Sequence, residues 1–384
     1  MSQIKIKKFY LNEETQILFN DGENYIVGLT ATGKTTLFNL IQFILGIRKN
    51  FNGIINNSQK PYITCEFTNN RLIKISRDFN SNEVVFTEGN TIKTVKVNSS
   101  ELNEVYSSFM NPSTEHYKRS ALDILNFSFL TAIDLGKSYF YKKKPLKSIL
   151  GYNEEYLESI ENDINKLKSG LEIEKQSLNL LDIYIENVRA SLLSINGVVE
   201  NPDQIIGILE MELTKVKKTY ESNYELLQRS KEIYDHELTL YDEFFQGRIL
   251  ELQPYFQEVL NLIMPSFESK LNNLTLSDLI NNKNINMNNT SMGEKIIIYF
   301  ALHLTLCRSL SNEKFQNGGS GLLVTDELFI FNDNYSLKRI RNKINEVTKV
   351  GELQYIGFTQ DSMQIPKENI VFSLPQNKGG SIFG

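Results

Sequence analysis

The run G-L-T-A-T-G-K-T-T from Gly28 to Thr36 constrains the fold of this chain more than any other stretch. It contains a complete G-x-x-x-x-G-K-[ST] loop, preceded by an apolar strand pattern at residues 25–27 and followed by an apolar helical stripe over 37–45. Gly28 and Gly33 let the backbone curl so that successive N–H groups point at phosphate oxygens. The sequence therefore predicts a phosphate-binding site between a strand and a helix.

Residue types in and beside the loop predict how a nucleotide is held. Lys34 is expected to reach the β- and γ-phosphates, and the Thr35 hydroxyl is expected to ligate Mg²⁺. Because the chain has no [NT]-K-x-D guanine-reading motif, the expected ligands are ATP and Mg²⁺ rather than GTP. The other residues expected at the nucleotide are Asn24, Gly28, Thr32, Gly33 and Thr36.

Length and composition set wider limits. The 384 residues are enough for two or three domains, and a hydrophobic content of 41% is enough for a core. The net charge is −5, so any contact with DNA must come from a local basic patch. Cys65 and Cys307 form no C-x-x-C pair, which disfavours a zinc site or a disulfide framework. The most apolar run, 296–307, is too short to cross a membrane and no signal peptide is recognisable, so we expect a soluble cytoplasmic protein.

The first 150 residues predict a β-rich lobe around the loop. Runs rich in β-branched and aromatic residues are separated by turns that contain Asn and Gly, which is typical of an antiparallel meander. The strands of this meander are expected at residues 62–67, 71–79, 83–87 and 91–97, and two further strands joined by a polar turn are expected at 3–10 and 16–19. A capping-box-like N-S-S-E predicts a helix from about Ser100, and a second helix is expected over 117–132.

Residues 151–263 have almost no strand signal, and their apolar residues recur at steps of three and four. Two such series flank a single turn near residues 196–203, where Asn201-Pro202 forms a cap and a helix start. Two long apolar seams around one turn predict an antiparallel coiled-coil hairpin. An all-helical bundle with the same seams is the alternative.

Residues 264–384 return to α/β character, and an acidic pair ends an apolar run expected to be a buried strand, L-L-V-T-D-E at residues 322–327. Beside a phosphate loop, Asp326 is expected to hold the metal and Glu327 to polarise the attacking water as a general base. Lys34 and Asp326 lie far apart in the chain with a coiled coil between them. The nucleotide fold is therefore expected to be split in sequence and rejoined in space.

With these features the chain resembles the SMC-like branch of the ABC-type ATPases, which includes the RecN, RecF and SbcC proteins of bacterial DNA repair and the SMC-like ATPases of anti-phage defence. The resemblance covers residues 1–50 and 285–365 and the general plan of the middle. It implies an α/β ATPase head built from an N-terminal lobe (1–150) and a C-terminal lobe (264–384), with the hairpin (151–263) inserted. It also implies a homodimer that sandwiches ATP between two heads.

The family's L-S-G-G-[QE] signature opens a helix that touches the γ-phosphate held by the other protomer. T-S-M-G-E-K at residues 290–295 matches in the Ser, the second Gly, the acid and the Lys, which implies that Ser291 and Gly293 contact nucleotide in trans. The resemblance places Asp333 at the dimer seam. The family's switch His corresponds to Gln360, which makes this glutamine a catalytic candidate.

The departures from the family pattern predict slow hydrolysis. A glutamine amide donates to a γ-phosphate oxygen but cannot become cationic, so Gln360 adds less transition-state stabilisation than a histidine. No Q-loop glutamine is recognisable near residues 133–136, and no Cys pair for a zinc hook stands at the turn of the hairpin.

Two sets of basic residues have more than one interpretation. Arg77 either reaches the nucleotide or is a surface arginine of its strand. A lysine cluster at the base of the hairpin, interleaved with aromatic residues, either contacts DNA phosphates or is a solvated charge run. Its members are Lys137, Lys142, Lys143, Lys144 and Lys147.

These features predict an SMC-like ATPase whose ATP-driven head dimerisation and hydrolysis gate DNA binding or a partner effector, in bacterial DNA repair or defence against phage. The expected partners are a second copy, double-stranded DNA and a separate effector or nuclease subunit, with no membrane. The alternative is a slow or non-hydrolysing ATP switch that holds or releases a partner toxin or nuclease. A permease-coupled ATPase is disfavoured by the long coiled coil.

Overall fold

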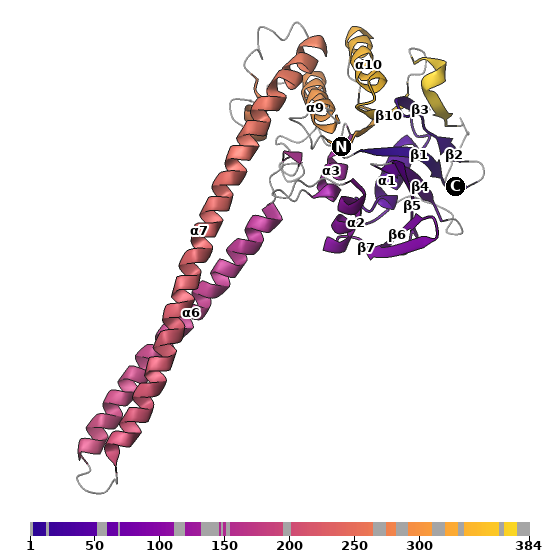
Figure 1. Cartoon of the computed structure of the whole chain (residues 1–384). Helices are drawn as coiled ribbons and strands as arrows, with labels where there is room; N and C mark the ends of the chain where they lie inside the picture. Colours follow the sequence, from indigo (N-terminus) through magenta and orange to yellow (C-terminus); the bar gives the residue numbers. More distant parts are fainter. Residues whose placement is uncertain are drawn as a thin grey trace. The chain divides into compact units, whose positions relative to one another are not determined.

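The structure is a computed structural model (Figure 1), and it divides the chain into two compact units. One unit comprises residues 1–153 with 245–384, and the other comprises 154–244. The predicted boundaries of the three sequence segments stay a prediction. The residues that the structure describes are 3–12, 15–51, 60–67, 70–110, 120–131, 146, 149–150, 154–194, 201–263, 274–281, 291–308, 319–328, 334–360 and 365–374.

A five-stranded parallel sheet in the first unit is built from both ends of the chain. Its order is β11 (Ile370–Ser373), β3 (Glu23–Val27), β10 (Gln354–Thr359), β9 (Leu322–Asp326) and β8 (Phe129–Thr131). The strand before the phosphate loop, β3, is therefore flanked on both sides by strands from the C-terminal end. β9 and β10 are apolar along most of their length, as strands covered on both faces are.

A six-stranded antiparallel sheet forms the second layer. Its order is β2 (Gln16–Leu18), β1 (Ile4–Tyr10), β4 (Tyr62–Phe67), β5 (Arg71–Arg77), β6 (Glu83–Glu88) and β7 (Thr91–Lys96). Buried and accessible residues alternate along β4 and β5, so one face packs on the core and the other faces water. The predicted meander is confirmed in β4 to β7, which pair antiparallel in chain order.

Helix α1 (Lys34–Ile44) lies between the two sheets, because it contacts β4 and β5 of one and β9 and β10 of the other. Just beyond its C-terminal end, Gly46 adopts the left-handed conformation at φ +74°, which favours glycine at this position. The other head helices are α2 (Ser100–Met110), α3 (Ala121–Phe127), α8 (Leu276–Asn281), α9 (Met292–Cys307) and α10 (Asn334–Lys349), with a 3₁₀ turn at Lys367–Asn369.

The helix expected over 117–132 is shorter than predicted. Within the described residues it covers Ala121–Phe127, and Phe129–Thr131 forms the edge strand β8 beside β9. The apolar run over these residues fits a buried helix or a buried strand equally well by periodicity alone. The pairing with β9 decides for the strand.

The second unit is an antiparallel pair of helices, α6 (Glu154–Ser194) and the first part of α7 (Pro202–Ile263), which lie side by side in Figure 1. Ile164, Leu171 and Leu227 form a buried cluster between them. Asn223 donates to Glu174 at 2.7 Å, and Arg189 pairs with Glu210 nearer the turn. The predicted α/β fold with an inserted coiled-coil hairpin is confirmed; residues 195–200 of the turn lie outside the described residues. Among the described residues, no helix has the length and apolar character of a membrane span.

Arg77 of β5 closes the C-terminal end of α1. Its guanidinium donates to the carbonyl oxygens of Phe43 (3.0 Å), Arg48 (2.7 Å) and Lys49 (2.6 Å), and burial lowers its pKa to about 10. The last carbonyls of a helix have no partner within it, so a cation there satisfies them. Arg77 does not reach the nucleotide, because the phosphate loop precedes the other end of α1, and it is not a surface residue, because it is buried. Both sequence interpretations are therefore wrong: Arg77 is a buried tether, a side chain that joins β5 to the C-terminal end of α1.

Replacing this tether is expected to destabilise the head. Arg77→Met leaves buried carbonyls without donors and should lower the free energy of unfolding by about 2–4 kcal/mol. Arg77→Lys should recover little, because one ammonium cannot reproduce the guanidinium fork. Urea unfolding followed by tyrosine fluorescence measures the change, with Arg229→Met, whose side chain is 76% exposed, as the control. Equal stability of the Arg77 and Arg229 variants would contradict the assignment.

Candidate nucleotide site

The phosphate loop joins the end of β3 to the start of α1, and its backbone requires glycine at two positions. A Cβ on Gly28 would lie 2.6 Å from the Thr32 hydroxyl and 2.9 Å from the Cβ of Leu374. Gly33 precedes α1 with φ at +98°, a conformation that L-residues rarely adopt. The Thr32 hydroxyl donates to the carbonyl of Leu29 at 2.8 Å and so closes the loop on itself.

Lys34 is buried, and its ammonium has three acceptors. It donates to the carbonyl oxygens of Gly28 and Leu29, both at 2.7 Å, and lies 2.9 Å from Oε1 of Glu327. The structure therefore brings the lysine of the N-terminal motif into an ion pair with the second acid of the C-terminal pair. A phosphate that enters the loop would compete with Glu327 for this ammonium.

Asp326 ends β9 and is 5% exposed. Burial raises the pKa of its carboxyl to about 6, although a hydrogen bond with the Thr35 side chain acts in the opposite direction. Its Oδ1 atom is buried and has no hydrogen-bond partner among the described residues. A buried carboxylate oxygen without a partner, beside a hydroxyl at the start of α1, fits Mg²⁺, which prefers oxygen ligands. Thr35 and Asp326 are thus the residues that would hold the ion.

Glu327 follows β9 in the left-handed conformation, with φ at +47°. Its N–H donates to the carbonyl of Phe358 at 3.0 Å, which fixes the backbone against β10. The side chain is 26% exposed, and its Oε1 accepts a hydrogen bond from Gln360 Nε2 at 3.3 Å. A non-glycine residue held in this conformation is an uncommon arrangement that functional sites often retain.

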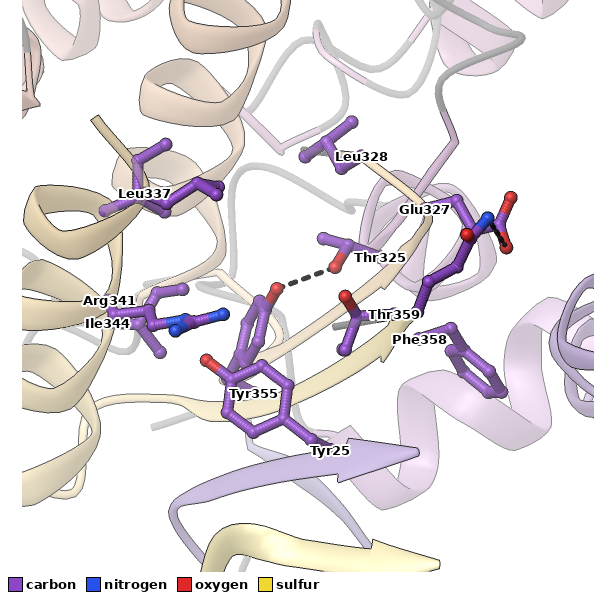
Figure 2. Close-up of a pocket in the computed structure, with 13 residues that line it drawn as sticks. Tyr25, Thr325, Glu327, Leu328, Leu337, Arg341, Ile344, Tyr355, Phe358 and Thr359 are labelled. Atoms are coloured by element: carbon purple, nitrogen blue, oxygen red, sulfur yellow. Dashed lines mark hydrogen bonds between the residues drawn. The ribbon is translucent and has the colours of Figure 1, made fainter. Parts of the chain in front are cut away.

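A cavity of about 200 Å³ lies between α10 and the parallel sheet, and Glu327 stands at one end of it (Figure 2). Tyr355 and Thr325 share a hydrogen bond of 2.7 Å on its floor, which links β10 to β9 directly behind the acidic pair. A Cβ on Gly357 would lie 2.9 Å from the Tyr355 ring, so the glycine leaves room for it. No motif in the sequence marks these supporting residues; only the strand pairing reveals them.

One residue predicted at the nucleotide lies elsewhere. Asn24 is completely buried near the start of β3, while the loop follows the other end of that strand. Its amide donates to the carbonyls of Asn20 and Gly22, and its Oδ1 accepts from the N–H of Asn20 at 2.7 Å. The prediction for Asn24 is wrong, because the side chain is used to hold the turn between β2 and β3.

The remaining predicted residues have different outcomes. Thr36 lies in the first turn of α1 beside Lys34 and Thr35. Ser291 caps α9 and forms a reciprocal capping box with Glu294, and Gly293 lies in the first turn of that helix. Their contact with a nucleotide in trans stays a prediction. Residues outside the described part of the chain are Asp333, Lys137, Lys142, Lys143, Lys144, Lys147 and the segment 133–136.

The loop, the acidic pair and the parallel sheet together define a P-loop nucleotide-binding protein of the α/β class. Residues 3–228, more than half of the chain, match the family model AAA_23, described as an AAA domain, and the chain belongs to this family. Together with the fold, this confirms the predicted resemblance to the SMC-like ABC-type ATPases. No curated protein matches the sequence.

Solved structures of Smc heads share the fold. A Smc head domain of Pyrococcus furiosus with an extended coiled coil, bound to the C-terminal domain of ScpA, is 15% identical, with a TM-score of 0.54 over 94% of this chain and 90% of that one. A Smc head domain of Pyrococcus yayanosii with a coiled coil and joint is 13% identical, with a TM-score of 0.51 over 93% and 92%.

Removing the charge of Asp326 is expected to stabilise the nucleotide-free protein. Because the folded pKa of about 6 exceeds the ordinary pKa of 3.8 for an aspartate, the ionised carboxylate is penalised at pH 7 and the penalty fades as the pH falls through 6 towards 4. Asp326→Asn should therefore raise the free energy of unfolding by about 1–3 kcal/mol at pH 7 and by little at pH 4.5. Urea unfolding at both pH values measures this difference.

The same variant should lose the response of ATP binding to Mg²⁺, measured with a fluorescent ATP analogue with and without the ion. If Asp326→Asn is less stable than the wild type at pH 7, the expectation that the ionised Asp326 carboxylate destabilises the nucleotide-free protein is contradicted.

Proposed function

We propose that this protein binds ATP with Mg²⁺ at the loop and hydrolyses it slowly. One observation carries the proposal: Lys34 and Thr35 from one end of the chain meet Asp326, Glu327 and Gln360 from the other. Thr35 and Asp326 would hold Mg²⁺, which neutralises phosphate charge when bound.

The contacts of Lys34 suggest how substrate prepares the site. The ammonium is paired with Glu327 at 2.9 Å, so binding of the phosphates requires it to turn from the carboxylate. Glu327 then loses its cationic partner and is available to accept a proton from the attacking water. Gln360, 3.3 Å from the same carboxylate, supplies a neutral donor, which supports slow turnover.

We further propose that two heads sandwich ATP. Ser291 is exposed at the start of α9, and the free N–H groups and dipole of a helix N-terminus favour phosphate. A partner copy would present Ser291 and Gly293 to the nucleotide on Lys34, with Asp333 at the seam. Dimerisation and release of the heads would control either the binding of double-stranded DNA by the lysines at 137–147 or the activity of a separate effector. The pathway would be bacterial DNA repair or phage defence. The ScpA domain bound to a similar Smc head supports a protein partner.

Two substitutions at the ion pair are expected to separate ATP binding from dimer release. Glu327→Gln removes the general base and frees Lys34 for phosphate, so it should accumulate a dimer when ATP and Mg²⁺ are present. Lys34→Ala should stay monomeric under the same conditions. Size-exclusion chromatography with light scattering measures both, with nucleotide-free samples as controls. Identical elution of the two variants with ATP would reject the sandwich.

The second candidate is a switch that holds ATP and rarely turns it over, restraining or releasing a partner toxin or nuclease. The neutral Gln360 favours it, because this side chain cannot become cationic. Phosphate release measured with and without duplex DNA distinguishes the two functions. DNA-stimulated turnover would count against the static switch, and undetectable turnover in both conditions would count against the ATPase cycle.

A further inference from the structure

The outer face of the antiparallel sheet has two adjacent rows of side chains that contain no acid. Strand register defines the rows across all six strands. One row consists of Leu18, Lys8, Thr64, Lys74, Thr87 and Ile92. The other consists of Gln16, Tyr10, Tyr62, Ser76, Val85 and Thr94. Their only charges are two lysines, in a chain whose net charge is −5.

Two tyrosines lie next to each other on this face. Tyr10 and Tyr62 are directly opposite each other on β1 and β4, and their rings stack with centroids 4.8 Å apart. Both side chains are partly accessible to solvent. Along β1 and β4, such partly accessible residues alternate with buried ones that face the core. An aromatic pair on an open sheet face offers a flat apolar surface that the core does not use.

The two lysines flank the tyrosine pair. Lys74 Nζ lies 4.1 Å from the centroid of the Tyr62 ring, and Lys8 Nζ lies 5.8 Å from that of Tyr10. Neither lysine forms an ion pair with a described residue. Their neighbours Lys5 and Lys7 differ, because both pair with Asp21. The positive charge beside the rings is thus left unneutralised within the described chain.

We propose that this face, centred on Tyr10, Tyr62, Lys8 and Lys74, binds single-stranded nucleic acid. Unpaired bases would stack on the tyrosine rings, and the lysine ammonium groups, on flexible stems, would move to backbone phosphates. Aromatic side chains combined with cations on an open surface are the two elements that single-strand binding requires. A duplex hides its base faces in its own stack and would gain only the lysine contacts.

This site is separate from the nucleotide site and does not require the proposed ATPase cycle. It is formed by one protomer, so Lys34→Ala, which is expected to prevent ATP-driven dimerisation, should leave it intact. If the wild-type protein dimerises with ATP but does not bind single strands, this inference alone is overturned. If it binds single strands but does not dimerise with ATP, the proposed cycle alone is overturned.

Fluorescence anisotropy with labelled oligothymidylate of 20 nucleotides, compared with a 20-base-pair duplex, tests the proposal on the full chain. Tyr62→Leu should weaken binding of the single strand by about 10-fold or more, whereas Tyr62→Phe, which retains the ring, should bind as the wild type does. Duplex binding should be unchanged by either variant. Lys74→Gln should lower the slope of log affinity against log salt by about 0.7.

Matched controls come from the helical hairpin, where Tyr224 is exposed and Lys215 pairs with Glu212 on the helix surface. Tyr224→Leu and Lys215→Gln should leave oligothymidylate affinity unchanged, and thermal unfolding of every variant excludes loss of the fold. Absence of single-strand binding by the wild-type protein would overturn the proposal. Equal affinity of Tyr62→Leu and Tyr62→Phe would overturn it as well.

Discussion

The pairing of β3 with β10 on one side and β11 on the other is the constraint on which the head depends. β3 leads into the phosphate loop, and both of its neighbours come from the C-terminal end of the chain. The same pairing aligns Phe358 of β10 with both Ile26 of β3 and Asp326 of β9, so the loop and the acidic pair follow the two strands that flank β10 and lie at the same edge of the sheet. Ion pairing of Lys34 with Glu327 is a consequence of that register rather than its cause.

Hydrogen bonds also connect the C-terminal strand β10 of the parallel sheet with the N-terminal strand β1 of the antiparallel sheet. The buried side chain of Gln354 exchanges hydrogen bonds with the backbone of Ile6 and donates to the carbonyl of Asn20. The nucleotide site differs, because Asp326 is buried and its Oδ1 atom accepts no hydrogen bond from a described residue. The buried amide of Gln354 therefore has hydrogen-bond partners, whereas one oxygen of the buried Asp326 carboxylate lacks one among the described residues. A bound cation would supply that missing partner.

Local motifs made part of this account predictable from the sequence. The loop, the helix after it and the acidic pair were recognisable because each is encoded within a short stretch, and the hairpin was recognisable because its apolar residues recur at steps of three and four. Arg77 was misjudged because its role depends on distant carbonyls at the C-terminal end of α1. Asn24 was misjudged because its amide holds the turn before β3 and also donates to the distant carbonyl of Tyr355. The Tyr10–Tyr62 stack also escaped notice, because strand register, not sequence spacing, makes the two residues neighbours.

A double-mutant cycle on the nucleotide-free protein tests most directly whether the two chain ends form one site. Lys34→Met, Glu327→Gln and the double variant are compared by their free energies of unfolding in urea. The 2.9 Å contact between a buried ammonium and a carboxylate predicts a coupling of about 1–2 kcal/mol. Lys34→Met combined with Glu352→Gln, whose carboxylate pairs with Arg308, should be additive. Additive effects of the Lys34 and Glu327 substitutions would contradict the account.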